Sequence, residues 1–370
     1  MQNKALHFKN GTFRIMQIAD IQEPYYVSSN TLRLINAALD EAKPDLVVLT
    51  GDQLKGYSPT LMGQNRRERV EDVISRILKP MASRGIPVTA TFGNHDDQCG
   101  ISNSEQMEIY KKCPSFVYND PADFGDDGTF YLTVDDRFII YLFDTHAKDG
   151  HGGYGMLRKD QIEWYRKVRD EFEEKNGTVL PSMAFQHIPT PEFFDVLKQT
   201  SPLDTKGIRA YGTHKYKWYT LDPHNSGLRD FLGETPASSY VNSGEVDAFL
   251  EKKDVKALFV GHDHKCSYVS KYKDIYLGFT QSCGFSAYGP DLNRGVRCID
   301  ISPDGSFETR TLTYYELCGT TVDDKLAYTL RRFAPASVAG VKTAFMETGA
   351  LLGTAGAIAG LVAISKKFKR

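Results

Sequence analysis

Short apolar runs that alternate with helical segments place the strongest limit on what this chain can fold into. Three runs in the first hundred residues predict strands: 13–19 alternates as a strand does, and 46–50 and 88–92 have the apolar pattern of buried strands. Between them, 30–43 and 70–81 carry apolar residues at helical spacing. This alternation predicts an α/β fold with a mostly parallel sheet, whose neighbouring strands end at one edge.

Each of these three strands ends in a polar element. Asp20 follows the first strand, Gly51-Asp52 the second, and Gly93-Asn94-His95-Asp96 the third. Alone, the last tetrapeptide is typical of a turn, because turns are rich in Gly, Asn and Asp. Ligands of open α/β sheets, however, bind at the carboxyl ends of strands. We therefore interpret the three polar ends as parts of one site.

The second half of the chain continues the pattern. Its predicted elements are a hairpin at 129–143, helices at 159–175 and 244–252, and strands at 182–185, 257–260, 275–280, 296–301 and 307–313. Two of the strands end in histidines, at Gln186-His187 and at Gly261-His262-Asp263-His264. Residues 200–243 have little periodicity and many turn formers, and we interpret them as an insertion over the site. We expect one domain over residues 1–330.

Composition narrows the class of protein. With 370 residues, 41% of them hydrophobic and 12% aromatic, the chain can bury a sizeable core. Its 45 basic and 47 acidic residues give a net charge of -2, so no strong signal points to nucleic acid. The six cysteines form no CxxC pair, and the N-terminus has no apolar stretch typical of a signal peptide. We expect a reducing compartment, the cytoplasm.

Residues 331–370 form a Gly/Ala-rich tail with a basic end. From Thr348 to Ile364 there is no charge, and five residues with four basic side chains follow at 366–370. As a helix this segment would reach roughly 25 Å, short of a hydrocarbon core of about 30 Å. It is consistent with membrane association in the bilayer plane or by re-entry, and equally with a helix packed on the domain or a loose tail.

The polar strand ends together supply more ligands than one metal ion needs. The candidate metal ligands are Asp20, Gln22, Asp52, Asn94, His187, His262 and His264. Oxygen and imidazole ligands suit Mn, Fe or Zn, in contrast to Ca or an iron–sulfur cluster. Two ions sharing a carboxylate are the usual machinery for hydrolysing phosphate esters. Two carboxylates against two divalent cations leave the site net positive, which favours an anionic substrate.

These elements, in this order, resemble the calcineurin-like metallophosphoesterase superfamily over about residues 12–313. The matching blocks are Asp20-x-Gln22, Gly51-Asp52, Gly93-Asn94-His95-Asp96, His187 and Gly261-His262-x-His264. Further segments, 187–193, 241–244 and 254–257, are similar to the branch that holds fungal cell-cycle-regulator phosphatases and plant purple acid phosphatases labelled as inactive. The resemblance implies a four-layer αββα sandwich.

The same resemblance implies a role for each residue. It assigns Asp20 and His264 to a first metal. Asn94, His187 and His262 would bind a second metal, and the carboxylate of Asp52 would bind both. Metal-bound hydroxide would attack phosphorus, and His95 would protonate the leaving oxygen as the catalytic residue. Asp96 would orient His95.

Two departures from the family pattern stand out. Gln22 occupies a position that is usually His, and its neutral amide oxygen is a weaker ligand than imidazole, so we expect looser binding of the first metal. Lys55 stands where purple acid phosphatases carry a tyrosinate, with Tyr57 out of register. We therefore expect no purple iron centre.

Other motifs admit simpler interpretations. Asp144-Thr145-His146 matches Asp-x-His better than Asp20-x-Gln22 does, but it follows the Asn-His element, and we expect a structural or substrate-facing role. Cys266 is interpreted as a structural thiol. In the insertion, basic and aromatic residues alternate over 206–219, as in a surface lid or in a segment that grips a phosphate and stacks a base.

The sequence thus predicts a dinuclear metal-dependent phosphoesterase, with a phosphorylated substrate of unknown identity and monoesters favoured. One alternative is a phosphodiesterase acting on nucleotides, nucleic acid or lipid head groups. Another is a metal-poor pseudoenzyme that acts as a binding or scaffold protein, because the first motif is imperfect.

Overall fold

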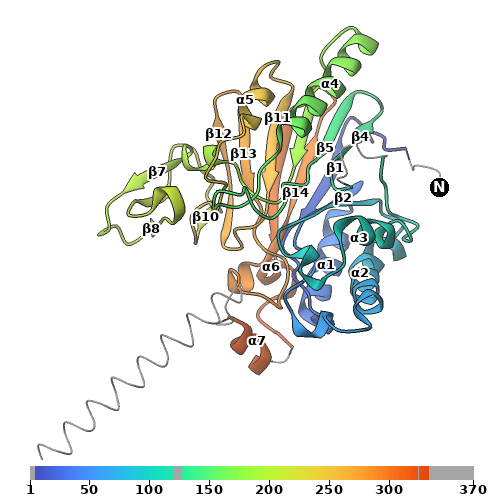
Figure 1. Cartoon of the computed structure of the whole chain (residues 1–370), viewed down its shortest axis with the longest axis vertical. Coiled ribbons are helices and arrows are strands. Elements are labelled where there is room, and N and C mark those ends of the chain that lie inside the picture. Colours follow the sequence, from blue (N-terminus) through green and yellow to red (C-terminus); the bar gives the residue numbers. More distant parts are fainter. Residues whose placement is uncertain (1–4, 120–126, 324, 333–370) are drawn as a thin grey trace, which may run out of the picture.

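Two β-sheets face each other in the computed structural model, with helices on their outer sides (Figure 1). The structure describes residues 5–119, 127–323 and 325–332. The apolar tail expected over residues 331–370 lies, from residue 333 on, outside the described residues. Among the helices of the described ranges, none combines the length and apolar character needed to cross a membrane.

The first sheet has five strands in the order β15-β14-β1-β2-β3. Their bounds are β1 Phe13–Ile18, β2 Leu46–Thr50, β3 Val88–Thr91, β14 Gly295–Ile301 and β15 Phe307–Thr313. Strands β1, β2 and β3 are parallel neighbours, with Ile15 opposite Leu46 and Val47 opposite Val88. The predicted parallel arrangement is confirmed. Strand β14 then pairs antiparallel with β1, so late residues complete a sheet that early residues begin.

The second sheet has seven strands in the order β10-β12-β13-β11-β6-β5-β4. Their bounds are β4 Phe130–Val134, β5 Phe138–Leu142, β6 Ser182–Phe185, β10 Phe231–Leu232, β11 Val255–Val260, β12 Cys266–Tyr272 and β13 Ile275–Phe279. Strands β5, β6, β11 and β13 run parallel in the middle of this sheet. Because β6 and β11 are neighbours, the histidines that follow them emerge at one edge.

Alternating side chains of the second sheet separate two hydrophobic cores. In β5, Ile140 and Leu142 belong to the core shared with the first sheet, whereas Ile139 and Tyr141 face the other way. The first core also takes up the helices α1 (Ser29–Ala42), α2 (Arg66–Ser83) and α3 (Asn103–Tyr110). The second core takes up α4 (Lys159–Asn176) and α5 (Glu245–Leu250). Helix, sheet, sheet and helix are the four layers expected from the sequence.

The insertion has more structure than its sequence indicated. A small sheet forms there from β7 (Leu197–Thr200), β9 (Trp218–Leu221) and β8 (Ile208–Arg209), and it projects from the body (Figure 1). These strands are two to four residues long, too short to show an alternating pattern. Strand β12 and the helices α3, α6 (Tyr314–Cys318) and α7 (Lys325–Arg332) were likewise not predicted.

Candidate metal centre

Strand ends from both sheets meet at the candidate site. Asp20 and Asp52 follow the parallel neighbours β1 and β2, and Asn94 follows β3. His187 follows β6 in the opposing sheet, and His262 and His264 follow β11. Hydrogen bonds from backbone N–H groups join the loops of the two sheets. Cys283 N–H donates to Ala19 O, and His262 N–H donates to a carboxylate oxygen of Asp20. The expected convergence of the strand ends is present.

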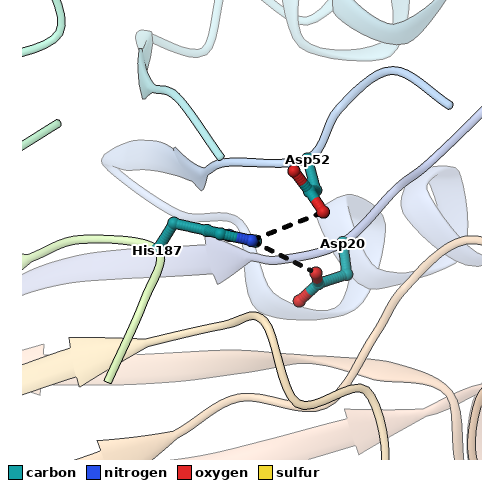
Figure 2. A group of neighbouring side chains, drawn as sticks. All are labelled: Asp20, Asp52 and His187. Atoms are coloured by element: carbon teal, nitrogen blue, oxygen red, sulfur yellow. Dashed lines mark ion pairs between the residues drawn. The ribbon is translucent and has the colours of Figure 1, made fainter. Parts of the chain in front are cut away.

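Asp20, Asp52 and His187 lie closest together. Each offers a ligand atom, and these atoms lie within 4.8 Å of one another (Figure 2). His187 Nε2 is 3.4 Å from Asp52 Oδ2 and 3.9 Å from Asp20 Oδ1. The other ring nitrogen, Nδ1, donates to the carbonyl of Thr50 at 2.9 Å, which fixes the ring with Nε2 toward the carboxylates. All three side chains are buried.

Two further histidines border this group. His264 Nε2 lies 3.3 Å from Asp20 Oδ1, while its Nδ1 donates to the carbonyl of Tyr288 at 2.7 Å. Its ring also stacks on Tyr288 with centroids 4.2 Å apart. His262 Nδ1 lies 3.3 Å from His187 Nε2. Each histidine thus directs one ring nitrogen toward the buried acids or toward a neighbouring ligand candidate.

The electric field of the site favours positive charge. Burial lowers the pKa of His187, but the charges of Asp52 and Asp20 outweigh it and raise that pKa to about 10. Burial also raises the pKa of Asp52, yet the opposing effects of His187 and His95 leave it well below its usual range. Burial and the neighbouring His187 lower the pKa of His262. A divalent cation placed among these groups would replace the proton that the acids now hold on His187.

Unpaired buried oxygens show that the donor set fits metal ions. Asp20 Oδ1, Gln22 Oε1 and Asn94 Oδ1 accept no hydrogen bond within the described part of the chain. Leaving a buried polar atom without a partner costs about 1–3 kcal/mol, so a cation bound by these three oxygens would offset that cost. Carboxylate, amide and imidazole donors together are the set that Mn, Fe or Zn accept.

Gln22 makes one contact that its sequence position did not indicate. Its Nε2 donates to Asp52 Oδ2 at 2.7 Å, so the amide orients the carboxylate expected to bridge both metals. Its oxygen is thereby turned away from Asp52 and is one of the unpaired buried atoms. Gln22 therefore has two separable functions, as a hydrogen-bond donor to Asp52 and as a candidate ligand.

Local backbone geometry explains the residues around the ligands. Asp20, Gln22, Asp52 and His262 have φ values of 52°, 40°, 52° and 73°, in the left-handed region that concentrates at functional sites. Gly93 has an ordinary φ, but a Cβ there would overlap Asp52 Oδ1. The third strand end can approach the second only because residue 93 has no side chain.

His95 and Asp96 have different surroundings from those expected. Gln98 donates its amide N–H to the carbonyl of Asn94, so its Oε1 accepts from His95 Nδ1 at 3.0 Å. The carboxylate of Asp96 instead accepts backbone N–H bonds from residues 52, 54 and 93 at 2.8–2.9 Å. The expected support of the His95 ring by Asp96 is corrected: the partner of the ring is Gln98, and Asp96 ties the second strand end to the third.

A cavity of about 180 Å³ opens beside the candidate ligands. Gln22, Asp52, His95, His262 and His264 line it. Tyr211, from the basic and aromatic stretch of the insertion, also lines it. Sequence reasoning did not single out the lining residues Tyr154, Glu234, Thr235, Ala237 and Tyr288, which carry no local signal.

The other motifs lie apart from this group. The His146 ring contacts Arg158, and Asp144 accepts from the Asn103 amide at 3.0 Å, as suits a structural motif. Cys266 is a buried free thiol whose Sγ donates to the carbonyl of Glu234. All six cysteines are free.

Comparison with known proteins identifies the class. The sequence profile described as calcineurin-like phosphoesterase matches residues 13–266, more than half of the chain. The chain belongs to this family.

Two relatives place it within the family. It is 25% identical to the "Probable inactive purple acid phosphatase 29" of Arabidopsis thaliana, over 78% of this chain and 76% of that protein. It is 26% identical to the phosphatase DCR2 of Saccharomyces cerevisiae, over 69% of this chain and 44% of that protein. The expected resemblance to the plant and fungal branch is confirmed. Among solved structures, a dimetal phosphatase from Danio rerio aligns with a TM-score of 0.49 at 13% identity, over 82% of this chain and 99% of that one.

Proposed function

We propose that this chain hydrolyses phosphate monoesters with the help of two divalent cations. The observation that carries the proposal is the meeting of Asp20, Asp52 and His187 with unpaired buried oxygens of Gln22 and Asn94. Membership of the calcineurin-like phosphoesterase family supports it. So does the cavity beside these residues, which gives a substrate access to them.

Each ligand candidate takes its expected place in this proposal. Asp20, Gln22 and His264 would hold one cation, and Asp52 would serve both. Asn94, His187 and His262 would hold the other. Once bound, the two cations would neutralise charge on the phosphoryl group and lower the pKa of the attacking water.

The residues of the chain then orient the reaction. Thr50 and Tyr288 carbonyls fix the rings of His187 and His264, which keeps their Nε2 atoms toward the acids. Gln98 accepts the Nδ1–H of His95, so only the doubly protonated ring would have a proton on Nε2 to give to the leaving oxygen. The backbone N–H of His95 donates to Asp52 Oδ1 at 2.8 Å. This bond links the position of His95 to that of the carboxylate expected to bind both cations.

One observation favours a second candidate, a metal-poor protein that binds phosphate esters without cleaving them. Both oxygens of Asp52, the carboxylate expected to bind both metals, already accept hydrogen bonds, Oδ1 from the His95 N–H and Oδ2 from Gln22. The word "inactive" in the name of the plant relative points in the same direction for that protein.

Metal analysis and hydrolysis assays on the purified full chain separate the two candidates. We expect about two ions per chain after loading with manganese. We also expect faster hydrolysis of p-nitrophenyl phosphate than of bis-p-nitrophenyl phosphate, and loss of both hydrolysis and metal in Asp52→Asn. Less than about one ion per chain with no hydrolysis of either ester would refute the catalytic proposal. Faster cleavage of the diester would establish a phosphodiesterase instead.

A further inference from the structure

Beside the metal cavity lies a second recess, and we propose that it binds a planar aromatic ring attached to the phosphate of the substrate. This inference rests on the proposed function, because it assigns the leaving group of the same reaction. The recess has a volume of about 70 Å³. Tyr154, Tyr211 and Ala237 line both this recess and the metal cavity, so the two spaces adjoin. A group bonded to a phosphate in the first space would enter the second.

Tyr154 lies at the boundary between the two spaces. Its ring meets the ring of His262, a candidate metal ligand, edge to face with centroids 4.2 Å apart. A ring in contact with Tyr154 is therefore one side chain away from the metal centre. This placement suits an aromatic group joined directly to the phosphate oxygen.

Tyr240 forms a fixed wall of the recess. Its backbone N–H donates to Asp149 Oδ2 at 2.8 Å. Its ring lies on glycine backbone from two loops, since a Cβ on Gly212 would lie 2.6 Å from Tyr240 Cε1 and one on Gly153 would lie 2.9 Å from Tyr240 Cδ1. These glycines let the ring join the loop after β5 to the insertion. The wall is thus built into the fold.

Tyr211 is an exposed lining residue of the recess. Its side chain is 76% exposed although its neighbours in the chain are held firmly. The His214 ring, three residues on, stacks on Phe194 with centroids 3.8 Å apart, and His214 Nδ1 lies 2.6 Å from the hydroxyl of Tyr219. An aromatic side chain held at the mouth of the site, with its face largely open to water, can cover a bound ring.

The chemistry and size of the recess determine which group can bind in it. The residues that line it within the described part of the chain are aromatic, small or hydroxylated, and none of them is charged. Aromatic pairs favour edge-to-face or offset contacts, which three tyrosines around one space can supply. A closed cavity of about 150 Å³ holds one benzene, so the recess of about 70 Å³ can take up one edge of a six-membered ring while the rest of the ring lies in the adjoining metal cavity or in solvent. The proposed substrate class is therefore an aryl phosphate.

Two non-hydrolysable phosphonates test the proposal without the influence of leaving-group reactivity. Phenylphosphonate and methylphosphonate carry the same anionic head and differ in the ring. Their dissociation constants are measured by calorimetry on the manganese-loaded full chain. We expect phenylphosphonate to bind about fivefold more tightly, the advantage typical of a favourable aromatic contact. Tyr211→Ala should remove this advantage, and Tyr211→Phe should keep it.

Tyr216 provides a matched control. It is also 76% exposed and lies in the same insertion, but it lines neither space. Tyr216→Ala should leave the preference for phenylphosphonate unchanged. Equal affinity for the two phosphonates, or an equal loss in both tyrosine variants, would overturn the aryl subsite while leaving the metal centre in place. Binding of neither phosphonate would overturn the proposed function together with the subsite.

Discussion

Replacement of Gln22 by leucine removes both functions of this residue, and measurements without and with metal distinguish the two losses. The substitution keeps the size of the side chain but removes the amide that donates to Asp52 Oδ2 at 2.7 Å. It also removes Gln22 Oε1, the unpaired oxygen that is a candidate ligand of the first metal. The first loss destabilises the metal-free protein, where removal of the unpaired oxygen offsets part of it, and the loss of a candidate ligand acts when metal is present.

The expected loss of stability follows from the burial of both partners. Asp52 is 1% exposed and Gln22 is 2% exposed, so water cannot replace the bond. A hydrogen bond to a charged group contributes about 1.5–3 kcal/mol. With an unfolding entropy of roughly 2.1 cal/mol/K per residue, the roughly 320 residues that the structure describes give about 0.7 kcal/mol per degree. The unfolding temperature in EDTA should therefore fall, by up to about 2–4 °C.

Manganese reveals the second loss. Removing one ligand should weaken binding of the first ion at least about tenfold, which takes about 1.4 kcal/mol from the stabilisation by metal at saturating concentration. The rise in unfolding temperature on addition of manganese should thus be about 2 °C smaller than in the wild type. Scanning calorimetry with and without manganese, together with a manganese titration, measures both quantities.

Gln17→Leu is the matched control. Gln17 is buried in β1, the strand that precedes Gln22, and its Nε2 donates to Thr50 Oγ1 and to the carbonyl of Val260, neither of which is a candidate ligand. This variant should be destabilised in EDTA but should gain as much from manganese as the wild type. If Gln22→Leu also keeps the full manganese gain, Gln22 is not a ligand. An unchanged unfolding temperature in EDTA would refute the argument from its bond to Asp52.

Three further predictions test other parts of the site. His95→Gln should slow hydrolysis about 10²–10⁴-fold with unchanged metal content, and a normal rate would exclude His95 as the acid. Gly93→Ala should cost about 1–3 kcal/mol of stability and weaken metal binding because its Cβ overlaps Asp52, whereas Gly227→Ala, whose Cβ would meet its nearest atom at 3.4 Å, should be tolerated in both assays. Burial lowers the pKa of His187, but Asp52 and Asp20 raise it to about 10, so manganese affinity should increase as the pH rises toward 10. Saturation at pH 8 should release about one proton per chain in a pH-stat, and a pH-independent affinity would contradict this.

Much of the fold could be predicted because its central strands carry a strong local signal. The run that became β2 is apolar on both faces, and those that became β1 and β3 are buried along nearly their whole length, as strands inside a parallel sheet are. The insertion carried no such signal. Strand β8 has two residues, and its pairing with Trp218 and Tyr219 depends on contacts across a turn that no local pattern encodes.

The site could be predicted as a set of residues but not as a network. Strand-end positions were enough to select Asp20, Asp52 and His187, because parallel strands deliver their ends to one edge. The hydrogen-bond partner of each side chain could not be predicted from strand-end positions. Gln98 supports His95 through the local turn after β3, whereas Tyr288 contacts His264 only because the fold brings two different loops together. Tyr154 and Tyr240 of the adjoining recess were hidden for the second reason, whereas Tyr211 belongs to the basic and aromatic stretch of the insertion.

The position of β14 has a consequence for the order in which the protein can assemble during synthesis. Strands β1, β2 and β3 leave the ribosome first, but the free edge of β1 waits for residues 295–301 before Phe13 can pair with Ile301. Until then the nascent chain presents an unpaired edge of apolar residues, the kind of surface that recruits other chains. The half of the ligand set that follows β6 and β11 also emerges before this edge closes. A chaperone that shields β1 in the nascent chain would therefore protect both the sheet and the site it carries.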